Sequence, residues 1–460
     1  MITDRQAIEA ARGAWMALAP MRSRRRRLKA FTYGRQWGDT TLTTDGRRVS
    51  EAQKLAEEGR TPVTNNIIRQ MVKSIIGRYR YMCGAAGDGD LAGARVGADL
   101  TAASVSETDA RALEEFLISG MAVQRIEGDR VENVSPERFF YHEFMDGDGS
   151  DLRLAGILRD MAVADVLERF AGGDVRRARE LKRVLAAERA APDIWPRGDD
   201  GSFDMPRLPQ SCRVVELWRL IRREALMVTD PFTGETRAES ADALERLEGI
   251  TRARAECGTE PLRWEYRVDG HWECEWLTPR GAVLGRARAA RCPVALKFYP
   301  LIDGEVHSLV EDVVDQQKYV NRLVSLLDHI ISSSAKGVLL YPADQLPEGF
   351  TWRDLRRIWA NPMGILPFRR TSKTMTPMQV NGGGNAGAGA ADMLKMQLQL
   401  FDEISGATGA LRGRSASATG EGMLRAELEN ATVSMLDVLA AFRSFVLRRD
   451  RLMAGKNVGL

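Results

Sequence analysis

The most regular pattern in the chain is a one-sided run of hydrophobic positions over Ser308–Ser334. Apolar side chains recur every three or four residues from Val310 to Ile331, which is the spacing of an amphipathic helix. Such a helix would extend roughly 40 Å, at about 1.5 Å per residue. Its other face is polar with few positive charges. A helix of this length needs neighbours along its apolar side, and these have to come from the rest of the chain or from other copies.

Further helices are predicted by the same periodicity. One contains the apolar stripe from Ile67 to Tyr79, with Thr64 or Asn65 available as its N-cap. Ser106, followed three residues later by Asp109, resembles a capping box that opens another helix. Two more helices are predicted near the C-terminus, over 390–404 and 421–451.

Strands are predicted where the period changes to two. The alternation around Glu127–Arg130 predicts a β-hairpin. From residue 213 to residue 299, short alternating runs separated by turn residues predict a β-rich segment. Together these patterns predict an α+β protein that is mainly α.

The nearly neutral net charge argues against tight binding of nucleic acid over the whole protein surface. The chain has 66 basic and 63 acidic residues, a net charge of +3, whereas a protein that grips DNA over its whole surface is far more basic. Four consecutive arginines, Arg24–Arg27, are one candidate nucleic-acid patch. A solvated helix face, or a surface that pairs with acidic residues of a neighbouring subunit, is the favoured interpretation.

Motifs for chemistry are nearly absent. The five cysteines are scattered without a CxxC pair, which indicates free thiols in a reducing compartment. We expect no metal site, no signal peptide and no membrane span, since no apolar run approaches the ~20 residues that a span requires. The sequence also contains no P-loop, HExxH or GxSxG motif.

A glycine-rich segment keeps one enzymatic alternative open. Gly382, Gly384 and Gly387 spell GxGxxG ahead of a helix. The dinucleotide fingerprint also requires a buried strand before the glycines and an acidic residue at the end of a second strand. Pro377 precedes the glycines and Glu403 lies inside a predicted helix. A flexible loop is therefore favoured over a nucleotide-binding enzyme that uses Gly382–Gly387, and we expect no enzyme and no cofactor.

The arrangement of the helices favours an assembly. The predicted helices over 308–334 and 390–404 flank a small α/β segment and are followed by a loop of small residues. A ring of identical subunits would cover the apolar stripes of these helices. The ring would enclose a tunnel lined by helices and by the loop.

Three groups of residues resemble the portal proteins of tailed bacteriophages, in the branch associated with short-tailed phages. The first is an aromatic-Gly-x-Gln-Trp pattern with a Gly-Arg-Thr-Pro segment after it, and the second is an Asp-x-Gln-x-x-x-Asn-x-x-x-Ser run. The third is an Ile-Ser-Gly segment at 404–406 with Gly413, ahead of the last predicted helix. One departure is Arg35, where the family usually has Asp. The motif residues, to which the resemblance assigns structural roles, are Gln36, Trp37, Arg60, Pro62, Asn65, Asp315, Gln317 and Asn321.

The resemblance implies a portal fold and a division of the chain. Residues 1–307 would form the wing, with the β-rich insert at about 213–299. The remaining parts would be the first stem helix at 308–334, the clip with its glycine-rich connection at 335–389, the second stem helix at 390–404, the tunnel loop at 405–420, and the short C-terminal wing or crown helix at 421–460.

The resemblance also implies a function. The protein would be a homo-oligomeric ring, usually a dodecamer, made in the cytoplasm of a bacterial host and built into one capsid vertex of the virion. Double-stranded DNA would be packaged and ejected through the ring without sequence-specific contacts. Its protein partners would be terminase, scaffolding and major capsid proteins, and head-completion or tail adaptor proteins. A scaffold or head-completion protein that forms no channel is the other open interpretation.

Basic residues supply the candidate contact sites on this template. Arg412 and Arg414 in the tunnel loop could touch the DNA backbone without reading bases, although solvent exposure or a salt bridge to a neighbour remains open for both. The clip carries an excess of basic residues that would suit an acidic docking partner. These clip candidates are Lys336, Arg353, Arg356, Arg357, Arg369 and Arg370.

Overall fold

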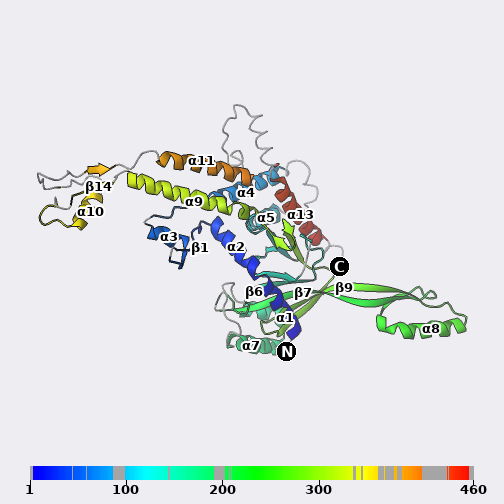
Figure 1. Cartoon of the computed structure of the whole chain (residues 1–460). Coiled ribbons are helices and arrows are strands. Elements are labelled where there is room, and N and C mark those ends of the chain that lie inside the picture. The colour runs from blue at the N-terminus through cyan, green and yellow to red at the C-terminus, as the bar shows by residue number, and fades with distance from the viewer. Residues whose placement is uncertain are drawn as a thin grey trace. The chain divides into compact units, whose positions relative to one another are not determined.

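The computed structural model, whose helices and strands are labelled in Figure 1, consists of two compact units. Unit 1 comprises Met1–Lys29, Ile75–Glu311 and Thr432–Leu460, and unit 2 comprises Ala30–Ser74 and Asp312–Ala431. Helix predominates over strand, so the predicted α+β, mainly α class is confirmed. The structure describes residues 4–43, 45–58, 60–85, 99–142, 146–190, 203–206, 208, 210–334, 338–342, 346–360, 367, 378–380, 386–406, 433 and 435–454.

Unit 1 is built around a large antiparallel sheet with the strand order β10-β9-β7-β6-β5. Its long strands β7 (Ser211–Thr229) and β9 (Arg263–Leu277) lie in the segment that the alternation predicts to be β-rich. β8 pairs with the outer part of β7. The shorter strands are β5 (Phe139–His142), β6 (Leu154–Ala162), β8 (Thr236–Ser240) and β10 (Val283–Ala289).

A smaller sheet shares its core with the large one. It has the order β11-β3-β4, and the pairing of Glu127 with Arg130 confirms the predicted hairpin. Val123 and Leu296 of this sheet are buried in one cluster with Phe139 and Ile157 of the large sheet. Each such side chain stabilises the fold by roughly 1.5–3 kcal/mol when fully buried. The strands are β3 (Met121–Glu127), β4 (Arg130–Asn133) and β11 (Val294–Phe298), and a separate short hairpin joins β12 (Leu301–Ile302) to β13 (Glu305–Val306).

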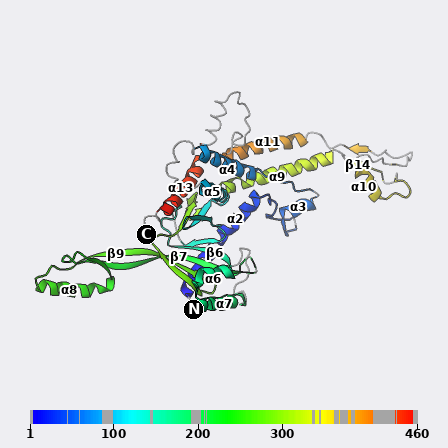
Figure 2. The ribbon, with the colours of Figure 1, turned by 180° about the vertical axis from the view of Figure 1, so that it is seen from behind.

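Helices cover both sheets of unit 1. α1 (Arg5–Ala17) buries one apolar face in a core that includes Phe140 and Val215. α6 (Val163–Ala171) and α7 (Val175–Ala190) contact each other and lie near the large sheet (Figure 2). Val166 and Leu181 of these helices are buried with residues of the sheet. The helices α5 (Asp99–Ser119) and α13 (Leu436–Ala454) pack on the smaller sheet.

The outer parts of β7 and β9 form an arm (Figure 1). The arm continues through β8 and a single 3-10 turn, η3 (Ala241–Ala243), into α8 (Leu244–Glu256). Its tip has a small core of its own, which consists of Leu226, Val228, Leu247 and Leu262. The alternating pattern of residues 213–299 predicted strands only, so the helix α8 within this segment was not predicted.

The long helix predicted over Ser308–Ser334 is observed as α9 (Leu309–Ser334), and most of it belongs to unit 2. The unit boundaries fall within α9 and within α2 (Ala19–Thr32) and α4 (Ile67–Ala85). The second predicted helix, α11 (Ala386–Ser405), begins at Ala386 rather than Ala390. The other elements are β1 (Thr40–Leu42), β2 (Arg48–Ser50), α3 (Glu51–Glu57), β14 (Val338–Leu340), α10 (Trp352–Ala360) and β15 (Met378–Val380).

Two local predictions within unit 1 are wrong. Ser106 does not open a helix, because α5 begins at Asp99 and continues past it. The arginine run is not simply a solvated face or a surface for a neighbouring subunit. Arg25 is 2% exposed and pairs at 2.6 Å with Glu115 and at 3.5 Å with Glu137 of its own chain. Helical periodicity carries no information about acidic partners so far away in the sequence.

Candidate functional site

Helix α9 carries a buried polar stripe within unit 2. Gln317, Asn321 and Ser325 follow one another at intervals of four residues, and their exposed fractions are 0%, 1% and 1%. Buried polar groups require hydrogen-bond partners, and here the partners include the backbone of residues 63–68. Ser325 Oγ, for example, accepts from the backbone N–H of Val63 at 2.9 Å.

Gln317 fixes the start of α4. Its Oε1 accepts from the backbone N–H groups of Ile67 at 2.9 Å and Ile68 at 3.2 Å, two donors of the first helical turn that have no carbonyl four residues earlier within the helix. Its Nε2 donates to the Asn65 carbonyl at 2.6 Å and to Asn321 Oδ1 at 3.0 Å. A side chain of α9 therefore caps α4 from outside that helix.

Asn321 extends the stripe to the segment after α2. Its Oδ1 also accepts from the backbone N–H of Asn65 at 3.0 Å, and its Nδ2 donates to Gln36 Oε1 at 2.6 Å. Gln36 Nε2 donates in turn to the Phe31 carbonyl at 2.8 Å and to Asn66 Oδ1 at 3.1 Å. The stripe thus ties two stretches of chain to α9, and both stretches belong to unit 2.

Most of the motif residues meet at this stripe, whereas Arg60, Pro62 and Asp315 form no hydrogen bond in it among the described residues. Asp315 lies on the exposed side of α9. Trp37 is at the edge, where its Nε1 donates to Thr64 Oγ1 at 3.1 Å. The motif residues that the structure brings together are Gln36, Trp37, Asn65, Gln317 and Asn321.

Sequence reasoning missed two features beside the stripe. The N-cap of α4 is Asn66, whose Oδ1 accepts from the backbone N–H of Arg69 at 3.0 Å, and not Thr64 or Asn65. Asparagine directly before a helix is a usual N-cap, so the position of Asn66 before Ile67 could have identified it from the sequence.

The second missed feature is an ion cluster. Lys318 Nζ lies 2.6 Å from the Asp39 carboxylate and 2.9 Å from that of Glu51. Arg322 also pairs with Glu51, at 3.1 Å. No local pattern connects these residues, which come from distant parts of the sequence.

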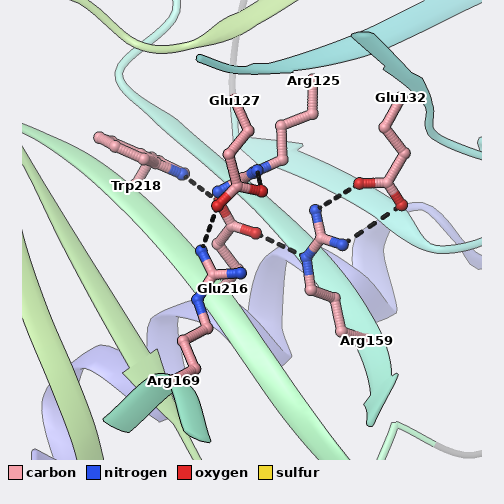
Figure 3. Close-up of polar contacts among 7 residues, drawn as sticks. All are labelled: Arg125, Glu127, Glu132, Arg159, Arg169, Glu216 and Trp218. Carbon is pink, nitrogen blue, oxygen red and sulfur yellow. Dashed lines mark hydrogen bonds and ion pairs between the residues drawn. The ribbon is translucent and has the colours of Figure 1, made fainter. Parts of the chain in front are cut away.

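Unit 1 holds a second buried network, which joins its two sheets (Figure 3). Glu216 of β7 accepts from Arg125 Nε of β3 at 2.6 Å and from Arg159 Nε of β6 at 2.7 Å. Burial raises the pKa of Glu216, but attraction to Arg125 and then to Arg159 outweighs it, so the pKa lies below 4.5. The remaining members of the network are Glu127, Glu132, Arg169 and Trp218.

Of the basic residues proposed for the clip and the tunnel loop, only those on α10 are among the described residues. Arg353, Arg356 and Arg357 are exposed on α10. The hydrogen bond from the Thr351 hydroxyl lowers the pKa of Asp354 on the same helix, with a smaller effect from Arg357. The candidates outside the described residues are Lys336, Arg369, Arg370, Arg412 and Arg414.

The glycine-rich segment lacks the surroundings of a dinucleotide site. Gly382 and Gly384 lie outside the described residues, but the strand before them, β15, is described. β15 pairs antiparallel with β14, whereas the dinucleotide fold requires parallel βαβ units. Glu403 lies within α11. These observations argue against a nucleotide-binding enzyme at Gly382–Gly387.

The comparison with protein families covers nearly the whole chain. The family model described as Phage P22-like portal protein matches residues 9–448, a span that includes the buried stripe and all three groups of motif residues. No curated protein matches the chain. No helix in the described ranges is long and apolar enough to cross a membrane. The chain therefore belongs to the Phage P22-like portal protein family.

Proposed function

We propose that copies of this chain close into a ring, of twelve subunits on the family template, and form a channel at one capsid vertex. Double-stranded DNA would enter the capsid through this channel during packaging and leave through it during ejection. Family membership supports the proposal, because portal proteins are oligomeric components of the capsid.

The observation that carries this proposal is the exposure of large apolar side chains on the long helices of unit 2. Tyr319 of α9 is 41% exposed, and Met393 and Met396 of α11 are 44% and 48% exposed. A single exposed apolar side chain is ordinary, but neighbouring ones form a patch that favours contact with another protein surface, and Met393 and Met396 are neighbours on the surface of α11. A closed ring of identical copies supplies such a surface to every subunit.

The parts of the ring are assigned on the same template. α9 and residues 390–404 of α11 would be the stem helices, and residues 335–389 would be the clip. Residues 405–420 would be the tunnel loop, residues 1–307 the wing and residues 421–460 the short crown. The exposed arginines of α10 would dock an acidic surface of terminase and later of a head-completion or tail adaptor protein. The scaffolding and major capsid proteins would be further partners.

The near-neutral charge of the chain supports light contact with DNA. Every phosphate contact adds salt-sensitive affinity, and a channel that held DNA firmly would stop its passage. Arg412 and Arg414 would touch the backbone without reading the bases.

Mass photometry and negative-stain imaging of the purified chain test this proposal. We expect closed rings with a central hole. Replacing Met393 and Met396 by aspartate should shift the population toward single chains, since charge opposes burial at a subunit contact. The matched control is Lys395→Asn on the same helix, where the side chain is 79% exposed. Solitary chains at every concentration, with no ring in virions, would rule the channel out.

A further inference from the structure

Helix α7 presents a strongly basic face to solvent. The exposed residues Arg176, Arg179, Lys182 and Arg183 follow one another at intervals of three or four positions, with Lys182 and Arg183 adjacent, so they share one side of the helix. In the parts of the chain that the structure describes, none of these four side chains forms an ion pair. Their charged groups are exposed on one side of α7.

The carboxylates in and next to α7 form no ion pair with these four side chains among the described residues, and Asp174 accepts from the backbone N–H of Arg176 at 2.8 Å. Glu180 of α7 pairs with Arg177 at 3.0 Å, and Glu188 pairs with Arg280 at 3.8 Å. α7 carries six basic and two acidic residues, while the whole chain has a net charge of only +3. Such a local excess of one sign attracts and orients partners of the opposite charge.

A hollow with apolar walls lies beside the basic face. Its volume is about 440 Å³. Val163 of α6 and Leu185 of α7 contribute apolar walls, and Lys182 and Arg189 bring positive charge to the same lining. Ala186 and Ala190 complete the lining, where their small side chains leave the space open.

We propose that the hollow and the basic face of α7 bind an acidic peptide segment of another protein. Carboxylates of the segment would pair with Arg179, Lys182 and Arg183, and one aliphatic or aromatic side chain would enter the hollow. A DNA duplex would engage the cations through its phosphates but would leave the apolar walls unused. The combination of charge and apolar lining therefore favours a peptide. This binding does not require the ring or the channel.

Fluorescence anisotropy with the full chain tests the proposal. The probe is a short fluorescein-labelled peptide with one tryptophan between runs of glutamate. We expect the triple variant Arg179→Glu, Lys182→Glu, Arg183→Glu to bind this probe about tenfold more weakly or worse, because attraction becomes repulsion. The control Arg252→Glu reverses an exposed charge on α8 and should leave the affinity nearly unchanged.

The hollow is tested separately from the charge. Ala186→Phe should weaken binding of the tryptophan peptide, but it should not weaken binding of the same peptide with serine in place of tryptophan. Three results would overturn the proposal. The triple variant could bind as well as the control, Ala186→Phe could have the same effect on both peptides, or a labelled DNA duplex could depend on these cations while the tryptophan peptide does not.

Discussion

Arg449 of α13 forms a buried salt bridge with Asp109 of α5. Arg449 also lies within 3.4 Å of Gln124 Oε1 on β3, so one side chain joins three elements of unit 1. Burial raises the pKa of Asp109 more than the attraction of Arg449 lowers it. Burying this pair costs desolvation free energy. Removing one partner alone should therefore lower the stability of the fold more than keeping both.

Replacing Arg449 by methionine tests this relationship. The variant leaves the Asp109 carboxylate buried without its counter-ion, so the free energy of unfolding should fall by about 3–5 kcal/mol. Chemical denaturation measures the change. Arg451→Met at an exposed position of the same helix is the control, and adding Asp109→Leu to Arg449→Met should restore much of the loss. Equal stability of the Arg449 and Arg451 variants would contradict this prediction.

The polar stripe of α9 should contribute to stability through Gln317. Gln317→Leu removes the side-chain acceptor of the buried backbone N–H groups of Ile67 and Ile68 and leaves only Ile67 with another acceptor, the Asn65 carbonyl. The free energy of unfolding should therefore fall by about 1–3 kcal/mol. Urea denaturation gives the value. Asp315→Ala, on the exposed side of the same helix, should change it by less than about 0.5 kcal/mol. A smaller loss for Gln317→Leu than for Asp315→Ala would be inconsistent with the capping role.

The buried carboxylate of Glu216 should make stability depend on pH in acid. The pKa of Glu216 lies below 4.5 in the folded protein, so the unfolded chain takes up the proton first as the pH falls. The stabilising contribution is complete above about pH 4.5 and is lost as the pH falls through the folded-state pKa.

Thermal unfolding of the wild type and of Glu216→Gln across acidic pH measures this effect. The midpoint of the wild type should fall more steeply below about pH 4.5 than the midpoint of the variant, which has no proton to bind at this position. Glu265→Gln on the exposed outer part of β9 is the control and should follow the wild type. Parallel curves for the wild type and Glu216→Gln would show that another group causes the acid sensitivity.

Alanine at both Arg412 and Arg414 tests the proposed tunnel loop. The double variant should assemble rings normally but impair DNA packaging or retention, because phosphate contacts along the channel are lost. Imaging of the rings and quantification of the DNA in virions separate the two effects. Normal packaging by intact rings of this variant would remove the loop from the mechanism.

Features with a local physical cause could be predicted from the sequence. The extent of α9 followed from apolar spacing within a single helix, and its observed start at Leu309 differs from the predicted start by one residue. The hairpin of β3 and β4 followed from alternation on both sides of one turn. The motif residues around Gln317 came from family resemblance, which indicated their importance but not that they cap α4.

Features that depend on distant partners could not be predicted in this way. Charged residues are mostly exposed, so nothing in the sequence around Glu216 or Arg25 indicates burial. The partner Arg125 lies 91 residues from Glu216, and Glu115 lies 90 residues from Arg25. Only the tertiary fold brings these charges together.

The arm of β7 and β9 is a part of unit 1 in which sequence changes should have local effects. Its tip folds around Leu226, Val228, Leu247 and Leu262, a cluster separate from the cores that hold the two sheets together. We therefore expect changes confined to this tip to leave the packing between the two sheets intact. The turn near Phe232, a residue 80% exposed, is for the same reason a suitable place to graft a label for imaging.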